Sequence, residues 1–287
     1  MRVASPRSLS AVHLAVVSGV SLDCHLNSPV SHAIFELTHI VLDFVLCVQA
    51  SRGIGLAFTT ELLKRTSATI VATSRSASES SQLHSLQQAW PGRIDTVSCD
   101  VTDATSTKAM AAHIKGTHEG KVDLLLNVAG LLHEQESGVM PERSLSSVDP
   151  AVLQRIMAVN AMGPLLVTQA VAPLLSKGAK IGNVSARVGS ISDNRLGGWW
   201  SYRMSKAALN MCTVNTANEL RRREVIAVSL HPGTTDTDLS APFQRNVKPE
   251  KLFTAGYSAG AMLDVLDGLT LEQSGKFFAY DGSQIEY

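Results

Sequence analysis

The sequence of 287 residues has no excess charge of either sign, few cysteines and few aromatic residues. Lysine plus arginine and aspartate plus glutamate number 25 each, so no surface field favours nucleic acid or an anionic membrane as a partner. The four cysteines show no paired spacing, and Cys47 and Cys99 lie in apolar runs, which is typical of reduced, buried thiols. The nine histidines include no HExxH-like motif. Although His113 and His118 flank the end of a predicted helix, we expect no metal site.

We also expect the chain to have no membrane span. The apolar stretch over residues 33–48 is broken by Glu36, His39 and Asp43. A membrane span needs about 20 consecutive apolar residues, so we predict none in this segment. No internal repeat or low-complexity tract is present either.

An N-terminal extension, residues 1–42, precedes the regular part of the sequence. It carries Arg2, Arg7 and several serines but no acidic residue before Asp23, a composition that resembles a transit peptide. An untargeted, poorly ordered extension explains the same residues equally well. The first interpretation predicts a chloroplast or mitochondrion, and the second predicts the cytoplasm.

From residue 43 onward, short β-branched runs alternate with longer helical patterns, which predicts βαβ units with right-handed crossovers. Strand runs that are apolar throughout indicate a parallel sheet buried on both faces. We therefore predict one α/β domain over residues 43–287, a single-domain Rossmann fold whose doubly wound parallel sheet has about seven strands. The predicted strands are Phe44–Val48, Thr69–Thr73, Ile94–Ser98, Val122–Leu126, Lys180–Val184, Val225–Ser229 and Lys276–Ala279.

The segment VLCVQASRGIGLAF, residues 45–58, joins the first predicted strand to the first helix. Its glycines let the backbone approach a pyrophosphate, and the helix N-terminus offers free N–H groups and a positive dipole end. Two glycines alone are weak evidence, but this loop opens the first βαβ unit, as in dinucleotide-binding proteins. We therefore predict cofactor contacts from Ser51, Arg52, Gly53, Ile54 and Gly55.

Two further segments follow predicted strands at their carboxyl ends, where open α/β sheets bind ligands. Asp100 and Val101 follow the third strand, and Asn127, Ala129 and Gly130 follow the fourth. Taken alone, Asp100 is equally explained as a cap of the next helix, and the second segment as a plain turn. Their order after the glycine loop favours a nucleotide site.

The charges around this site indicate which dinucleotide it binds. An NAD site usually has an acidic residue about twenty residues after the glycine loop, on the ribose 2′-hydroxyl. Here the second strand ends in Ser74 and Arg75 without an acid, and Arg52 lies in the loop itself. Two guanidinium groups suit a 2′-phosphate, so we predict NADP(H) in preference to NAD(H). The alternative is that both arginines are solvated surface charges.

Tyr202 and Lys206 are spaced i and i+4, which places them on one face of a helix. A free phenol has a pKa of about 10 and is a poor acid–base group at neutral pH. We expect the Lys206 ammonium and an oxidised nicotinamide ring to lower the pKa of Tyr202. Tyr202 could then exchange a proton with the substrate oxygen while hydride moves between substrate and nicotinamide.

These motifs, together with ARVGSISDNRLGGWWSYRMSKAALN (residues 186–210) and HPGTTDTDLS (residues 231–240), resemble the short-chain dehydrogenase/reductase family. Within it, the likeness is to the carbonyl-reductase group that includes sniffer and C-factor. The resemblance implies that Tyr202 is the acid–base, that Lys206 is its partner and that Asn160 holds a proton-relay water through a helix kink. It also implies adenine contacts from Asp100 and Val101, and a nicotinamide side lined by Pro232, Gly233 and Thr237.

The glycine loop departs from the family pattern TGxxxGxG, because Val48 and Gln49 directly precede Ala50. The first glycine is either replaced by Gln49 or deleted. Deletion is slightly favoured, because VQGASRGIG is a sequence associated with close relatives. The family motif NNAG is also changed, to NVAG at residues 127–130.

The catalytic serine of the family has no certain counterpart. Aligning NVSA with the usual NISS puts Ala186 at the serine position, which leaves Ser185 and Ser190 as the available hydroxyls. Ser190 lies twelve residues before Tyr202, close to the family spacing, so we prefer Ser190 and keep Ser185 as the alternative.

Two aromatic residues and one later segment have two possible roles. They either line a substrate pocket or pack in the core or in a homo-oligomer interface: Trp199, Trp200 and the segment Leu239–Phe253.

We predict an NADPH-dependent oxidoreductase of the carbonyl-reductase type, acting on a small ketone, aldehyde or alcohol. One alternative is an NAD-dependent alcohol dehydrogenase. The other is a catalytically weak or inactive nucleotide-binding scaffold or sensor with an impaired loop, against which the intact Tyr202 and Lys206 argue.

Overall fold

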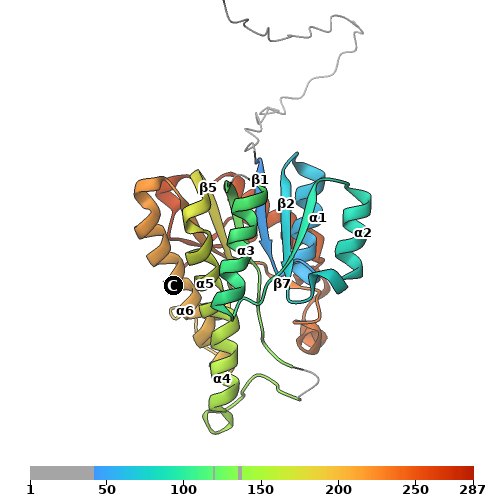
Figure 1. The fold of residues 1–287 in the computed structure, drawn as a ribbon. Helices are drawn as coiled ribbons and strands as arrows, with labels where there is room; N and C mark the ends of the chain where they lie inside the picture. Colours follow the sequence, from blue (N-terminus) through green and yellow to red (C-terminus); the bar gives the residue numbers. More distant parts are fainter. Residues whose placement is uncertain (1–41, 119, 135–137) are drawn as a thin grey trace, which may run out of the picture. The chain divides into compact units, whose positions relative to one another are not determined.

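The computed structural model describes residues 42–118, 120–134 and 138–287. They form a central sheet of eight strands in the order β10-β9-β6-β5-β4-β1-β2-β3, with helices on both faces (Figure 1). All neighbouring strands are parallel except β9 and β10. The predicted extension, residues 1–42, lies outside the described residues apart from Leu42, so both interpretations of it stay predictions.

The strands of this sheet are β1 (Phe44–Val48), β2 (Thr69–Ser74), β3 (Ile94–Ser98), β4 (Val122–Asn127), β5 (Leu175–Val184), β6 (Ile226–His231), β9 (Phe277–Ala279) and β10 (Gln284–Ile285). A separate small sheet pairs β7 (Thr234–Thr235) with β8 (Leu252–Phe253). The α-helices are α1 (Gly53–Arg65), α2 (Ser81–Ala89), α3 (Ala104–Thr117), α4 (Pro150–Met157), α5 (Gly163–Val171), α6 (Trp200–Leu220) and α7 (Ala255–Asp267).

The structure confirms the predicted doubly wound parallel sheet, and each of the seven predicted strands corresponds to an observed one. Two differences have local causes. β5 begins at Leu175, which pairs with Val122 before the register shifts at a bulge. β10 adds an antiparallel edge strand of two residues, which is too short to form a recognisable sequence pattern.

Alternating residues of the strands build two apolar layers, one on each face of the sheet. On β1, Val45 and Cys47 face one layer, whereas Leu46 and Val48 face the other. The first layer is closed by α1, α2 and α7, and the second by α3, α5 and α6. Completely buried strand residues of this kind each contribute about 1.5–3 kcal/mol of transfer free energy.

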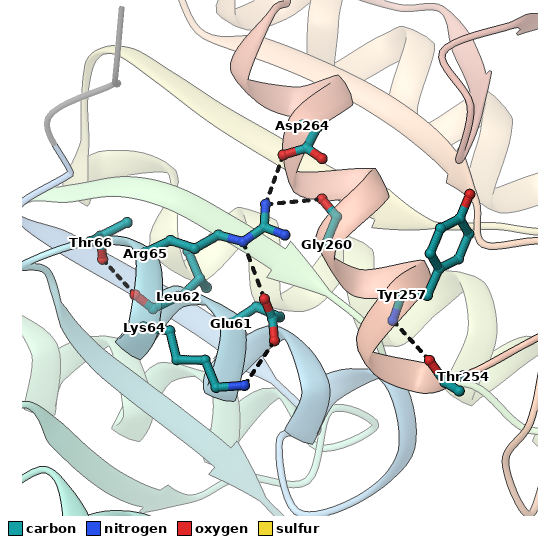
Figure 2. A network of polar contacts seen from close by, with 9 residues as sticks. All are labelled: Glu61, Leu62, Lys64, Arg65, Thr66, Thr254, Tyr257, Gly260 and Asp264. Atoms are coloured by element: carbon teal, nitrogen blue, oxygen red, sulfur yellow. Dashed lines mark hydrogen bonds and ion pairs between the residues drawn. The ribbon is translucent and has the colours of Figure 1, made fainter. Parts of the chain in front are cut away.

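Arg65, in the last turn of α1, ties this helix to α7 (Figure 2). Its guanidinium donates to the Asp264 carboxylate at 2.7 Å, to the Gly260 carbonyl at 3.3 Å and to Glu61 of its own helix at 3.2 Å. A Cβ at Gly260 would collide with this guanidinium. The ion pairs are largely exposed and individually weak, but together they fasten α1, the helix that follows the glycine loop, against α7.

Residues Pro150–Leu174 form one helical stretch that is long and apolar enough, by length and composition, to cross a membrane. In this fold it packs with its apolar side chains Ile156, Val167 and Val171 buried. Core helices of globular domains pass the same test, so the sequence-based expectation of no membrane span stays a prediction.

Candidate active site

A cavity of about 1160 Å³ opens at the carboxyl ends of the parallel strands. This is the edge at which open α/β sheets bind their ligands. The segments that follow six successive strands of the sheet all contribute to the wall. Their residues include Gln49, Arg75, Asp100, Val128, Ser185 and Pro232.

Gln49 follows β1 directly and has a φ of +66°, a left-handed conformation that glycine adopts without strain. Its carbonyl oxygen lies where a Cβ of Gly55 would be, so position 55 has room only for glycine. Because Gln49 lies outside β1 and occupies the turn itself, the structure favours replacement of the glycine. The deletion preferred from the sequence is not supported.

The N-terminus of α1 is available to an anion. No side chain caps it at Arg52, and its first turn contains no acidic residue. Gly53, Ile54 and Gly55 line the cavity, whereas Ser51, also predicted as a contact, is not among the lining residues. The free N–H groups, the positive end of the helix dipole and the two glycines, Gly53 and Gly55, fit the pyrophosphate of a nicotinamide dinucleotide.

Asp100 and Val101 line the cavity next to the end of β3, together with Arg52 and Arg75. Asp100 does not cap α3, because that position belongs to Asp103. Hydrogen bonds from the Thr102 amide and hydroxyl, at 2.8 and 2.7 Å, hold the pKa of Asp100 below its ordinary value, and the Arg75 charge adds to this effect. Asp100 therefore remains an acceptor at neutral pH.

Asn127 does not line the cavity, in contrast to Ala129 and Gly130. Its buried side-chain amide donates to Asn183 of β5 at 2.8 Å and to Thr168 of α5 at 3.2 Å. The side-chain nitrogen of Asn127 thus links β4 to its neighbours, and the predicted cofactor contact of Asn127 stays a prediction. A polar residue at a strand end cannot be assigned to the ligand or to the interior from sequence alone.

Asn160 lies in a π-helical turn, Ala158–Met162, that joins α4 to α5 and constitutes the predicted kink. Its side chain accepts a hydrogen bond from the Leu131 amide at 2.7 Å and donates to the Leu131 carbonyl at 2.8 Å. It also donates to Ser205 at 2.9 Å, and Ser205 donates to the Tyr202 carbonyl at 2.8 Å. Asn160 therefore connects the loop after β4 to the helix of Tyr202. Its predicted contact with a relay water stays a prediction.

Tyr202 and Lys206 both line the cavity from the first turns of α6. The Lys206 ammonium is 5.7 Å from the Tyr202 ring centroid and donates to the Val184 carbonyl at 2.8 Å. Burial raises the pKa of the Tyr202 phenol, and the lowering expected from Lys206 together with an oxidised nicotinamide ring stays a prediction. Burial likewise lowers the pKa of Lys206 to about 8, since desolvation disfavours both charged forms.

The two candidate serines differ in position. The Ser190 hydroxyl donates to the Glu286 carbonyl at 2.5 Å, accepts from the Asp193 amide at 3.1 Å and lies outside the cavity lining. Ser185 does line the cavity, although its hydroxyl donates to Asn210 at 2.7 Å. The sequence preference for Ser190 is therefore not supported, because the carbonyl of Glu286, which follows β10 and is distant in sequence, accepts a hydrogen bond from its hydroxyl.

An aromatic wall runs from Tyr202 through Trp199 and Phe243 to His133. Neighbouring ring centroids are 6.3, 4.9 and 5.8 Å apart, and all four residues line the cavity. Trp200, by contrast, is exposed and outside the lining. Sequence reasoning missed His133, although it lies three residues after the NVAG segment and so close to the strand end.

Glu142 was also missed, and it fixes the start of α6. Its carbonyl accepts the Trp199 amide at 2.6 Å, and its buried carboxylate accepts hydrogen bonds from the Ser201 amide and hydroxyl. Trp199 at this junction has a φ of +51°, a conformation that is strained for a bulky side chain. Glu142 satisfies donors that a helix N-terminus leaves free, and so it positions the turn that carries Tyr202.

The geometry of loop, cavity and tyrosine–lysine pair agrees with the comparisons to known proteins. The family model described as short chain dehydrogenase matches residues 43–248. The chain belongs to the short-chain dehydrogenase family. The membership implied by the sequence motifs is thereby confirmed, and with it an NAD(P)-dependent enzyme acting on C=O or CH–OH groups of small molecules.

Individual members of the family show how far the similarity extends. A 1-hydroxy-2-glutathionyl-2-methyl-3-butene dehydrogenase of Rhodococcus is 38% identical over 190 residues, covering 66% of this chain and 78% of the relative. C-signal of Myxococcus xanthus is 39% identical over 180 residues, covering 62% of this chain and 100% of the relative. The structure of NADPH-bound carbonyl reductase from chicken fatty liver is 30% identical with a TM-score of 0.76, covering 86% and 100% of the two chains.

Proposed function

We propose that the protein reduces a ketone or aldehyde with NADPH and that Tyr202 donates the proton. The bound nicotinamide would supply a hydride to the carbonyl carbon. The Tyr202 hydroxyl gives its proton to the carbonyl oxygen, so that an alcohol and a phenolate result. The observation that carries this proposal is that Tyr202 and Lys206 line the same cavity as the uncapped N-terminus of α1.

The protonation states favour the reductive direction. Burial raises the pKa of Tyr202, so the phenol carries its proton at neutral pH and is ready to donate it. Burial lowers the pKa of Lys206 to about 8, which leaves most of this amine protonated at pH 7. The Lys206 ammonium then stabilises the phenolate that remains after proton transfer. In carbonyl reduction Tyr202 thus acts as the general acid, and in alcohol oxidation the same group would act as the base.

The preference for NADPH rests on Arg52 and Arg75. Both side chains are exposed, both residues line the cavity, and neither forms an ion pair with another of the residues that the structure covers. β2 ends in Ser74, so no carboxylate is present there to bind a ribose 2′-hydroxyl. The chicken carbonyl reductase, of similar fold, is described with NADPH bound.

The substrate suited to this cavity is a carbonyl compound with a planar apolar group. Trp199 and Phe243 stand beside Tyr202, and Leu239 and Val247 add apolar surface to the same wall. Aromatic faces bind planar groups by offset or edge contacts. Aryl ketones and quinones therefore fit this wall better than short hydrophilic aldehydes.

The test is NADPH oxidation with a panel of aryl ketones, quinones and aliphatic aldehydes, comparing wild type with Tyr202→Phe. General acid catalysis is worth about 10²–10⁴-fold, so turnover should fall by this factor while NADPH still binds. Tyr257→Phe, at an exposed tyrosine outside the cavity, is the matched control and should keep wild-type turnover.

Three results would contradict the proposal. Equal turnover in Tyr202→Phe and wild type would remove the tyrosine from its role. Higher kcat/KM with NADH than with NADPH would support the competing alcohol dehydrogenase. NADPH binding without turnover of any carbonyl would support a nucleotide-binding scaffold, an alternative consistent with the strained Gln49.

A further inference from the structure

Three metal-ligating side chains meet at the end of the sheet opposite to the cavity. Asp95 is the second residue of β3, and His113 and His118 lie in the last turn of α3 and at its C-cap. The Asp95 Oδ2 atom is 2.7 Å from the His113 Nε2 and 3.0 Å from the His118 Nε2. One ligand atom from each residue lies within 4.8 Å of the other two. None of the three residues lines the catalytic cavity.

We propose that Asp95, His113 and His118 form a binding site for a divalent transition-metal ion of the Zn²⁺ type. Zinc binds imidazole nitrogen and carboxylate oxygen at about 2.0–2.2 Å, which sets tetrahedral ligands about 3.3 Å apart. The two observed N–O separations need to widen by only a few tenths of an ångström to admit such an ion. Two imidazoles with one carboxylate favour zinc over calcium or magnesium, which prefer oxygen ligands.

The surroundings hold two of the ligands in place. Asp95 is fixed by the backbone pairing of β3 with β2. The His118 ring packs against the ring of buried Phe44 in β1, with centroids 4.6 Å apart, which restricts its orientation. His113, on the outer side of α3, needs only a rotation of its side chain to adjust.

Charge and access also suit a cation at this place. The site lies at the C-terminus of α3, where the helix dipole presents its negative end. The side chains of His113, Asp95 and His118 are 39%, 31% and 19% exposed, so an ion from solvent can enter and a water molecule can complete the coordination. The two histidines were noted in the sequence without a third ligand, because Asp95 is eighteen residues away from His113.

Protons compete with the metal for the same atoms. Without an ion, the Nε2 atoms of the two imidazoles are hydrogen-bonded to the Asp95 carboxylate. Metal binding requires both nitrogens to be deprotonated. The experiment must therefore distinguish a metal site from a contact between β3 and α3 that is made by hydrogen bonds alone.

The experiment is calorimetric titration of the full-length, EDTA-treated protein with Zn²⁺, repeated on His113→Gln, Asp95→Asn and the control His84→Gln. We expect one saturable equivalent in wild type and in the His84→Gln control, whose histidine is exposed on α2 and is not part of the cluster. This equivalent should disappear in His113→Gln and Asp95→Asn. Titration with Co²⁺ should give the visible absorption of a tetrahedral complex in wild type and His84→Gln, and not in His113→Gln or Asp95→Asn.

Thermal unfolding supplies a second readout. A ligand present at 100 times its Kd should raise the Tm of a domain of this size by about 5–10 °C, and His113→Gln should abolish this increase. His113 is partly exposed, so its variant should remain folded and keep a Tm close to that of the wild type in EDTA. Zinc binding of equal stoichiometry and affinity in wild type and His113→Gln, or no saturable binding at all, would overturn the proposal. The titration does not depend on NADPH oxidation, so it stands or falls separately from the proposed function.

Discussion

The amino ends and the carboxyl ends of the parallel strands differ in how their polar groups are satisfied. At the amino ends, charged side chains satisfy backbone groups of neighbouring segments. Asp123 accepts hydrogen bonds from the Asp43 and Phe44 amides at 3.0 Å each. Arg93 donates to two carbonyls that precede β2, at 2.8 Å each. Lys180 donates to the last two carbonyls of α7, at 2.5 and 2.9 Å.

At the carboxyl ends, polar groups are left without partners and the backbone is strained. Within the described part of the chain, five buried side-chain atoms lack a hydrogen-bond partner, and all belong to residues at this edge: Thr73, Ser74, Asn127, His133 and His231. Of the three non-glycine residues with positive φ in the described part of the chain, Gln49 and Trp199 lie at this edge, and Glu224 lies before β6 at the opposite edge. Unpaired groups and strain cost stability, and proteins retain them where a ligand is bound. The amino ends therefore stabilise this fold, and the carboxyl ends serve its chemistry.

The largest effect expected at the carboxyl ends, apart from loss of Tyr202, comes from Arg75→Ala. A charge-assisted contact to a phosphate is worth about 1.5–3 kcal/mol, so affinity for NADPH should fall about 10–100-fold. Affinity for NADH, which has no 2′-phosphate, should hardly change. Fluorescence titration with both cofactors measures this ratio, with Arg222→Ala, at an exposed arginine outside the cavity, as control. Equal losses for both cofactors would make Arg75 a structural residue.

At the amino ends, Asp123→Ala should lower the free energy of unfolding by about 1–3 kcal/mol, because two amide donors lose their acceptor. The kcat of the folded enzyme should stay within a factor of two, roughly, since no lining residue is touched. Urea unfolding and steady-state kinetics measure the two quantities. Asp43→Ala, which removes an exposed carboxylate, should be nearly neutral. A large loss of kcat in Asp123→Ala would contradict the inference that the amino ends of the strands contribute to stability and not to catalysis.

A pH profile tests the charge of Lys206. Burial lowers the pKa of Lys206 to about 8, so this amine loses its proton above that pH and no longer stabilises the Tyr202 phenolate. The kcat/KM for carbonyl reduction should therefore be level below pH 8 and fall about tenfold per pH unit above it. Lys206→Arg retains the charge and should remove this decline, at a lower absolute rate. A wild-type kcat/KM that stays level up to pH 10 would exclude stabilisation of the Tyr202 phenolate by the Lys206 charge.

The smallest effect is expected from Gln49→Gly. A left-handed conformation costs a residue with a Cβ about 1–2 kcal/mol, part of which is offset by the greater freedom of glycine in the unfolded chain. The variant should be more stable by about 0.5–1 kcal/mol and should bind NADPH more tightly, because a cavity-lining side chain is removed. Insertion of a glycine between Gln49 and Ala50 should give neither gain. If the insertion alone restores tight binding, the loop suffers from a deletion after all.

Sequence patterns along the chain were sufficient to predict the architecture and much of the site. Strand and helix periodicity predicted the parallel sheet, and the positions of Gly53, Gly55, Asp100, Tyr202 and Lys206 follow from it, because loops after parallel strands converge at one edge. The spacing of Tyr202 and Lys206 requires only that α6 be a helix. Local sequence was informative wherever function depends on residues close together in the chain.

Contacts between segments distant in sequence determined which of the predicted site residues face the cavity. The hydroxyl of Ser190 is occupied by the carbonyl of Glu286, and the side-chain nitrogen of Asn127 turns to Asn183, so neither residue lines the cavity. Burial, a property of the whole fold, raises the pKa of Tyr202 where neighbouring charge alone suggested a decrease. The sequence by itself determined the fold and the tyrosine–lysine pair through periodicity and spacing. Only the tertiary structure determined which polar groups meet the ligand, because that depends on partners that packing brings from elsewhere in the chain.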